Sequence, residues 1–288
     1  MIWTCLALLR SQAGRNCARA LTAVPSDPAL ILQPAKLNVV LRRRLRLPLL
    51  LLSSRCDGCK RRLDRFGDHW CACMRSGRVQ RRAKPVEVTW ARVLREAGRE
   101  AGATVHCQHL LRHTTLPVDG EDNRRMDVVV NGLPLYHGRP LFCDATVRSP
   151  LKGDGEPHSK AATENGAVLR RAKTDKEDKY RDLALSPLAE LRVLACEVGG
   201  RWDEEAVNLV RDLAKVKAAN THPLLRRSVE LAWVDRWWAM LGVAVQDAVA
   251  ASLLVEDGKQ VQETPATWVP ELNELLNGQR LATEATGR

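Results

Sequence analysis

The chain has 288 residues, enough for one large domain or two small ones, and its 45% hydrophobic content can form a buried core. Its formal net charge of +11 indicates nonspecific attraction to polyanions. Nine cysteines, an odd number in a long chain, argue against a disulfide scaffold, and no stretch reaches the ~20 apolar residues of a membrane span, so we expect no membrane partner.

Residues 1–54 are predicted to be helical, and a compact Cys/His segment follows at 55–77. Apolar residues at helical spacing predict a helix over 85–102, which Pro85 opens and Gly102 closes. The patterns beyond it predict strands at 105–111, 124–130, 140–147 and 191–198, a charged helix at 160–184, helices at 203–219 and 224–255, and then a loose tail. The order is therefore α-β-β-β-α-β-α-α, an α/β fold.

The Cys/His segment has the spacing of a metal knuckle. Two residues separate Cys56 from Cys59, nine separate Cys59 from His69, and three separate His69 from Cys73. Three thiolates and one imidazole suit tetrahedral zinc, which would supply much of the folding energy of so small a segment. Cys71 is an alternative fourth ligand, and free cysteines in a loop are the alternative interpretation of the whole motif.

Basic residues surround this segment and indicate a surface that contacts the phosphates of nucleic acid, with DNA as the expected partner and RNA as the alternative. A purely structural zinc clip is the competing role, and the two roles can coexist. The predicted nucleic-acid contacts are Arg61, Arg62, Arg78, Arg81, Arg82 and Lys84.

Two aspartates stand out in the predicted strands. Asp127 precedes three valines, and Asp144 interrupts an apolar run, where a buried charge needs a partner. Carboxylates on adjacent strands can hold one Mg²⁺, an arrangement that suits metal-assisted cleavage of a phosphodiester. The alternative is a salt bridge to Arg124, Arg125 or Arg148.

The charged helix adds a candidate cation to the site. Lys176 and Tyr180 lie four residues apart and hence on one helical face, with Lys179 one step round. A lysine beside a metal-bound water can orient the nucleophile or stabilise charge on the phosphorane. A solvated charged face is the alternative interpretation of the two lysines.

The order α-β-β-β-α-β, with acids on the second and third strands, is similar to the PD-(D/E)XK restriction-like endonuclease core. More closely, residues 35–255 resemble the C-terminal part of non-LTR retrotransposon proteins, in which a zinc knuckle follows the reverse transcriptase and precedes such an endonuclease. The stretches that carry the resemblance are Cys56-x2-Cys59, Leu63-Asp64-x2-Gly67-Asp68-His69-x3-Cys73, Arg124-Arg125-Met126-Asp127, Asp144-Ala145-Thr146-Val147-x-Ser149-Pro150-Leu151, Lys176-x2-Lys179-Tyr180 and Glu197-Val198-Gly199-Gly200-Arg201-Trp202.

The resemblance extends to multicopy retroelement-derived proteins of dinoflagellates, and residues 18–50 resemble the exit from a reverse transcriptase thumb. No polymerase motif lies upstream, so we interpret the chain as a truncated or domesticated fragment. The resemblance implies four parts: a helical remnant at 1–54, the zinc knuckle with its basic flank at 55–84, the endonuclease core at 85–220, and C-terminal helices and tail at 221–288.

The resemblance also assigns roles. Asp127 would be the PD aspartate and Asp144 the second magnesium ligand, with Lys176 or Lys179 as the lysine and Tyr180 beside it. Three departures put activity in question: Met126 replaces the usual proline, Thr146 occupies the slot of the motif lysine, and Gln108 stands where an acid is expected on the first strand.

The function implied is that of a Mg²⁺-dependent DNA endonuclease, a hydrolase acting in the nucleus. One rival is a catalytically inactive, zinc-dependent nucleic-acid-binding relic. The other is a helical interaction protein with no nucleic-acid role, built on a stripe that more often belongs to a core: Trp233, Trp237, Trp238 and Leu241.

Overall fold

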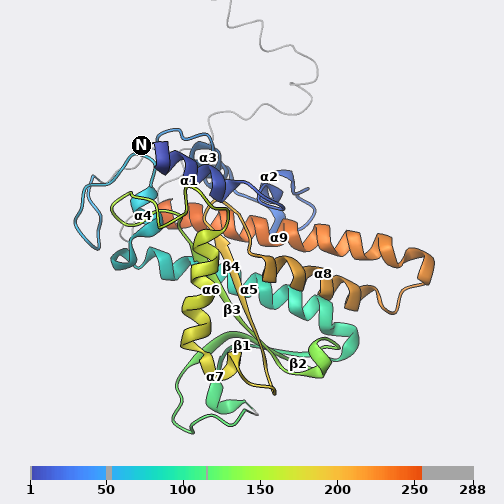
Figure 1. Ribbon diagram of the computed structural model, residues 1–288. Helices are drawn as coiled ribbons and strands as arrows, with labels where there is room; N and C mark the ends of the chain where they lie inside the picture. Colours follow the sequence, from blue (N-terminus) through green and yellow to red (C-terminus); the bar gives the residue numbers. More distant parts are fainter. Residues whose placement is uncertain (1, 50–53, 115, 255–288) are drawn as a thin grey trace, which may run out of the picture. The chain divides into compact units, whose positions relative to one another are not determined.

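Four strands form one mixed sheet in the order β1-β2-β3-β4 (Figure 1). The computed structural model describes residues 2–49, 54–114 and 116–254, so the predicted C-terminal tail lies outside the described residues. The strands are β1 (Thr104–Leu110), β2 (Arg125–Asn131), β3 (Leu141–Arg148) and β4 (Glu190–Glu197). The mixed α/β class predicted from the sequence is therefore confirmed.

The register of the sheet brings the predicted acids together. β1 pairs with β2, and β2 with β3, in antiparallel fashion, with Cys107 opposite Val128 and Val128 opposite Cys143. One step along each strand places Gln108, Asp127 and Asp144 in one row across three strands. A two-residue offset in either pairing would have separated them.

β3 and β4 are parallel, so a crossover must connect them. That crossover consists of the segment 149–166, helix α6 (Ala167–Lys179) and helix α7 (Arg181–Ala184). Leu169 and Ala172 of α6 pack on Val193 and Ala195 of β4. The crossover therefore places α6 against one face of the sheet, beside β3 and its aspartate.

The opposite face of the sheet carries the main core. Helices α5 (Arg78–Gly98), α8 (Glu204–Ala218) and α9 (Arg226–Leu254) pack there, with Trp90 and Trp238 among the buried side chains. Helices α2 and α3 lie on α9. The remaining helices are α1 (Ile2–Gln12), α2 (Arg19–Thr22), α3 (Pro34–Arg44) and α4 (Asp68–Ala72), with short 3-10 turns at Pro28–Leu30, Met74–Ser76, Arg99–Ala101, Leu111–His113, Tyr136–Gly138 and Pro223–Leu225.

Helix α9 is the most apolar long element among the described residues. The helical stretch Pro223–Leu254 contains an 18-residue window of mean hydropathy 1.4, which is apolar enough to cross a membrane, but 72% of that window is buried. Trp237, Trp238 and Leu241 are all buried and Trp233 is half-buried. The tryptophan stripe therefore belongs to the core and does not form a partner surface.

Two predicted helices have different boundaries in the structure. Helix α5 begins at Arg78, so Pro85 lies inside it and does not open it. Gly77, with a left-handed φ of 68°, starts the helix early, and the buried side chains of Arg78 and Arg82 anchor its first turns. The charged helix begins only at Ala167, after Gly166 with a φ of 68°.

Candidate functional site

The predicted knuckle residues converge on one point. The ligand atoms of Cys56, Cys59, His69 and Cys73 all lie within 4.8 Å of one another. The Sγ atoms of Cys56 and Cys73 are 3.8 Å apart, and Sγ of Cys59 lies 3.1 Å from Nε2 of His69. Three sulfurs and one imidazole nitrogen make a donor set compatible with zinc. Cys71 is buried but does not belong to this group, so Cys73 is the fourth member of the candidate ligand set.

Local turns hold the knuckle together. A Cβ atom on Gly58 would lie 2.2 Å from the carbonyl oxygen of Arg75, so only glycine fits at this point of the first turn. The Asp64 carboxylate accepts hydrogen bonds from the backbone N–H groups of Phe66, Asp68 and His69. These bonds fix the start of α4, which carries the histidine ligand.

The knuckle thiols differ in acidity. Burial raises the pKa of Cys56 to about 11. Burial also acts to raise the pKa of Cys59, but a hydrogen bond from the Arg61 backbone N–H and the neighbouring ligands outweigh it and lower that pKa to about 7. A cation in the group would favour both thiolates, because a coordinating thiol is held deprotonated.

Two of the six predicted phosphate contacts are wrong, because their side chains are buried. Arg78 donates to Asp57 and to the Ser252 carbonyl oxygen, and its guanidinium lies 4.2 Å from the centre of the Trp70 ring. Arg82 is 1% exposed and donates to the carbonyl oxygen of Cys71. Both arginines fasten the knuckle to the helical core. The exposed members of the predicted set are Arg61, Arg62, Arg81 and Lys84.

Asp144 is the most deeply buried acid of the candidate magnesium site, with 2% of its surface exposed. Lys176 of α6 donates to its Oδ2 at 2.7 Å. Its Oδ1 is buried and accepts no hydrogen bond within the described residues. Thr146 lies two residues further along the same strand, so the lysine reaches Asp144 from the helix and not from the strand slot.

The predicted salt-bridge alternatives for the aspartates are wrong. Arg124 pairs with Asp122 and Asp182, and Arg148 approaches Asp175 at 3.7 Å. Among the described residues, no ion pair joins Arg125 to either candidate acid. The charge of Asp144 is balanced by Lys176.

Asp127 is linked to an acid that the sequence analysis missed. Its Oδ2 accepts from the Ala145 backbone N–H at 2.8 Å and its Oδ1 from the Gln108 amide at 3.2 Å. The same Gln108 nitrogen donates to Glu87 of α5 at 2.8 Å. Gln108 has a left-handed φ of 50°, an unusual conformation for a strand residue that turns its amide between two acids.

Glu87 places a carboxylate next to Gln108, the residue that stands where an acid was expected on the first strand. It is buried, and it lies three residues before Trp90 and seven before Leu94, on the apolar stripe of α5. A charged residue on an apolar stripe was the signal that could have identified it. Burial raises the pKa of Asp127 to about 7, with further contributions from the charges of Asp144 and Glu87.

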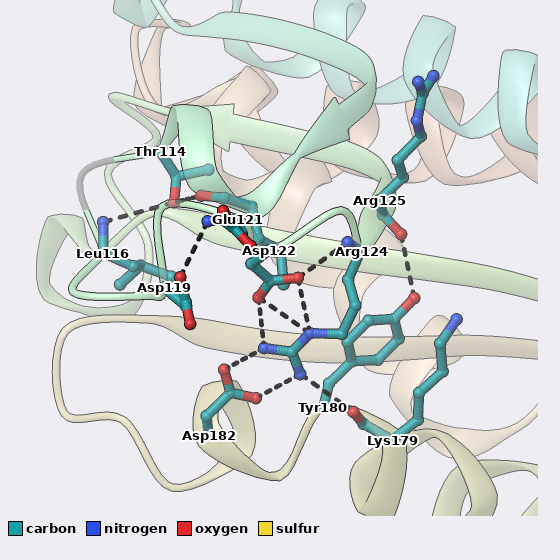
Figure 2. Close-up of polar contacts among 11 residues, drawn as sticks. Thr114, Leu116, Asp119, Glu121, Asp122, Arg124, Arg125, Lys179, Tyr180 and Asp182 are labelled. Atoms are coloured by element: carbon teal, nitrogen blue, oxygen red, sulfur yellow. Dashed lines mark hydrogen bonds and ion pairs between the residues drawn. The ribbon is translucent and has the colours of Figure 1, made fainter.

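Tyr180 and Lys179 differ in their relation to the acids. Helix α6 ends at Lys179, and Tyr180 is 1% exposed and donates to the carbonyl oxygen of Arg125 at 3.0 Å (Figure 2). Burial, followed by the charges of Asp144 and Asp127, raises the pKa of Tyr180 well above its ordinary value. Lys179 is exposed, with Nζ 4.6 Å from the centre of the Tyr180 ring. Lys176 is therefore the lysine that faces the acids.

Arg124 fixes the end of α6 next to the acids. Its guanidinium donates to both oxygens of Asp122 and of Asp182, and to the carbonyl oxygen of Lys179 (Figure 2). Asp122 precedes β2 and Asp182 belongs to α7. The cluster therefore ties the strand that carries Asp127 to the helix that carries Lys176.

The two candidate centres differ in how tightly their ligands gather. Within the described residues, the knuckle is the one group in which three or more His, Cys or acid ligand atoms lie within 4.8 Å of one another. In the acid site, the Gln108 amide donates to both Asp127 and Glu87, and the Lys176 ammonium donates to Asp144. The uncapped Oδ1 of Asp144 and the bridged pair Asp127 and Glu87 offer oxygen donors, the type that Mg²⁺ prefers.

Comparison of the sequence with models of protein families and with curated proteins finds no match.

Proposed function

We propose that the chain is a zinc-containing, Mg²⁺-dependent DNA endonuclease module of the kind found in non-LTR retrotransposons. The observation that carries the proposal is Asp144. It lies in the row of Gln108 and Asp127 across the sheet, is buried, has a lysine on one oxygen and leaves the other without a donor. A buried carboxylate with an uncapped oxygen costs free energy unless a ligand compensates it, so a functional role accounts for the arrangement.

The acids divide the proposed work among three elements. Asp144 on β3 and Asp127 on β2 would hold Mg²⁺, and Glu87 on α5 would complete the set, directly or through water. Mg²⁺, when bound, would polarise the scissile phosphate and lower the pKa of a bound water. The raised pKa of Asp127 fits this role, because a nearby cation would return that carboxyl to its charged form.

Lys176 is the proposed catalytic cation. Its ammonium donates to Asp144 at 2.7 Å, so it lies at the acids and carries donors that can stabilise charge developing on a phosphate. It comes from α6, which is independent of the strand, so Thr146 in the strand slot does not by itself abolish the chemistry. When substrate binds, the Lys176 ammonium would exchange its hydrogen bond to Asp144 for a contact with the substrate phosphate.

The knuckle is the proposed binding element. Cys56, Cys59, His69 and Cys73 would bind zinc, and exposed basic residues around them would contact the DNA backbone. Phosphate contacts of this type are sequence-independent and weaken as the salt concentration rises. The basic residues in question are Arg61, Arg62, Arg81 and Lys84, all of them exposed.

The test is nicking of supercoiled plasmid by the full chain with Mg²⁺. We expect the wild type to convert supercoiled to open circular DNA, and Asp144→Asn to lose this conversion. Asp178→Asn, which removes an exposed acid of the same helix as Lys176, is the matched control and keeps it. Equal nicking by wild type and Asp144→Asn would reject the catalytic role of the acids.

The second candidate function is a nucleic-acid-binding relic without cleavage. The observation that favours it is the occupation of the acids by the chain's own groups: Lys176 on Asp144, and Gln108 between Asp127 and Glu87. Such internal compensation would keep the fold without a metal. Salt-dependent DNA binding with no Mg²⁺-dependent nicking, and loss of binding in Cys56→Ser, would support this reading.

A helical interaction protein receives less support. Trp237, Trp238 and Leu241, on which that reading depends, are buried in the core formed by α5, α8 and α9. Retroelement origin and action in the nucleus follow from the resemblance and remain proposals.

A further inference from the structure

The His69 ring of the knuckle contacts a segment that is distant in the sequence. Nε2 of His69 faces Sγ of Cys59 at 3.1 Å, inside the candidate zinc group. Its other nitrogen, Nδ1, lies 2.7 Å from the carbonyl oxygen of Gly153. Gly153 belongs to the segment 149–166 between β3 and α6, 84 positions further on. The ring therefore links the knuckle to the crossover of the sheet.

The contacted segment has a defined structure of its own. Leu151 and Pro157 form a bridge, and the Lys152 N–H donates to the Glu156 carbonyl oxygen. The Gly155 N–H donates to Lys152, and the His158 N–H donates to the Pro150 carbonyl oxygen. These bonds make a small hairpin, which we call the crossover hairpin (residues 150–158). His69 contacts it near its tip.

The crossover hairpin lies between two residues of the acid site. Asp144 precedes the end of β3 by four residues, and Lys176 lies in the helix that the segment enters. The separation of their side chains, 2.7 Å in the structure, depends on how β3 and α6 are connected and packed. A restraint on the hairpin is therefore a restraint on the position of α6 beside β3.

The metal decides which ring nitrogen carries the proton. A cation bound through Nε2 uses the lone pair of that nitrogen, so the ring proton must reside on Nδ1, where it can be donated to a carbonyl oxygen. Without the cation, the ring can take the other tautomer and share its proton with the Cys59 sulfur. The His69–Gly153 hydrogen bond is thus favoured by the loaded knuckle.

We propose that His69 is a positioning residue through which metal binding in the knuckle holds the crossover hairpin, and with it the spacing between β3 and α6. The inference rests on the zinc-binding part of the proposed function and is independent of whether the acids cleave DNA. Metal at the knuckle would then act on the acid site through the backbone of a segment that carries none of its ligands.

An electrostatic attraction is consistent with the same alignment. Asp154, next to Gly153, has its pKa lowered by a hydrogen bond from the Glu156 N–H and also by the charges of Lys152 and Arg61. Arg61 belongs to the knuckle. The charge of Arg61 therefore acts on Asp154, the residue next to Gly153.

The test is amide hydrogen exchange of the full chain during a zinc titration, read at the bonded amides of Lys152, Gly155 and His158. The protonation of the His69 ring nitrogens is followed in parallel by ¹H–¹⁵N NMR. We expect zinc to slow exchange at these amides about fivefold to tenfold, the scale of one hydrogen bond. The effect should saturate at the same zinc equivalent at which His69 becomes protonated on Nδ1.

The variant His69→Cys separates metal binding from the hydrogen bond to Gly153, since it keeps a fourth metal donor and removes the ring N–H. We expect this variant to bind zinc without slowing exchange in the hairpin, whereas Cys5→Ser, at an exposed position outside the knuckle, behaves as wild type. Zinc-independent exchange in the wild type would overturn the proposal, whether or not His69→Cys still binds the metal. Full hairpin protection in zinc-loaded His69→Cys would overturn it too.

The experiment also separates this inference from the nuclease proposal. Asp144→Asn should show the zinc-dependent protection of the wild type, because the hairpin hydrogen bonds do not include Asp144. If the wild type does not nick DNA but shows zinc-dependent protection of the hairpin, the result would count against the nuclease proposal and support the role of His69.

Discussion

The knuckle and the acid site are built on opposite principles. All four knuckle ligands lie within residues 56–73, and turns inside that segment bring them together. The acid site takes Glu87 from α5, Asp127 from β2, Asp144 from β3 and Lys176 from α6, so it exists only once the sheet has formed. A local site can help the chain to fold, whereas a site assembled from distant elements depends on a fold already present.

The two sites also differ in their effect on stability without a metal. In the knuckle, the raised pKa of Cys56 keeps that thiol neutral at pH 7, whereas the lowered pKa of Cys59 lets its thiol ionise. The acid site buries its carboxyl groups close together, with Lys176 on Asp144 and Lys84 on Glu87, and the charged form of Asp127 opposes folding at neutral pH. Five predictions test this contrast, beginning with the largest expected effect.

Loss of the knuckle metal should destabilise the whole described fold. Cys56→Ser should bind no zinc and lower the thermal midpoint by roughly 10 °C, because metal binding supplies folding free energy. Cys71→Ser, at a buried cysteine outside the ligand group, should retain one zinc. Metal analysis and calorimetry measure both. A zinc-free Cys71→Ser with a loaded Cys73→Ser would reverse the ligand assignment.

Loss of Asp144 should act on chemistry. Asp144→Asn should reduce the plasmid-nicking rate about 10²- to 10³-fold, because a carboxamide is a poor ligand for Mg²⁺ and lacks the charge that the site requires. Zinc content should be unchanged. An unaltered rate would mean that the buried aspartate serves structure alone.

Substitution of Lys176 and of Lys179 should have clearly different effects on the nicking rate. Lys176→Gln should slow nicking about 10- to 100-fold, since it removes the ammonium that contacts Asp144. Lys179→Gln, at an exposed position over the Tyr180 ring, should remain within a factor of about two. The same plasmid assay at saturating Mg²⁺ compares them. The reverse ranking would place the catalytic cation at the other lysine.

Stability should fall with rising pH in the zinc-loaded protein without magnesium. Burial raises the pKa of Asp127 to about 7 from an ordinary value of 3.8, so between these values the native state binds more protons than the unfolded chain. The free energy of unfolding should therefore decrease over this window, by at most ~1.4 kcal/mol per pH unit for this group.

Urea unfolding at a series of pH values measures that slope. Asp127→Asn should flatten part of it, and Asp203→Asn another part, because burial raises the pKa of Asp203 to about 7 as well. Added Mg²⁺ should offset the Asp127 part alone. A slope that Asp127→Asn leaves unchanged would place its carboxyl in a solvated setting.

Gln108 should have the smallest effect. Gln108→Asn keeps a residue that tolerates a left-handed φ but shortens the side chain, so its amide no longer reaches both Glu87 and Asp127. We expect the Mg²⁺ affinity, measured by calorimetric titration, to change by about fivefold, equivalent to ~1 kcal/mol. Unaltered affinity would show that the amide bridge does not position the acids.

The predictability of each region follows from the same contrast. The spacing of Cys56, Cys59, His69 and Cys73 was sufficient to predict the knuckle, because its geometry is local. Asp127 and Asp144 were visible as charges in apolar strands, and the register of the sheet then brought them into one row. The mixed sheet and its crossover followed from the alternation of strand and helix patterns.

What escaped prediction depends on long-range packing. Glu87 looked like one charge among many in a basic helix, and its link to Asp127 through Gln108 appears only in the folded structure. Arg78 and Arg82 looked like phosphate contacts, but their partners lie in the knuckle and in α9. Lys176 could not be separated from Lys179 until the end of α6 was known.

The position of α9 has a consequence for synthesis of the protein. This helix packs against α2, α3, α5 and α8, yet its residues 226–254 follow all of those partners in the chain. On the ribosome, the apolar faces of these helices must wait in water until α9 has emerged. The core that these helices share can therefore close only after residues 226–254 have left the ribosome.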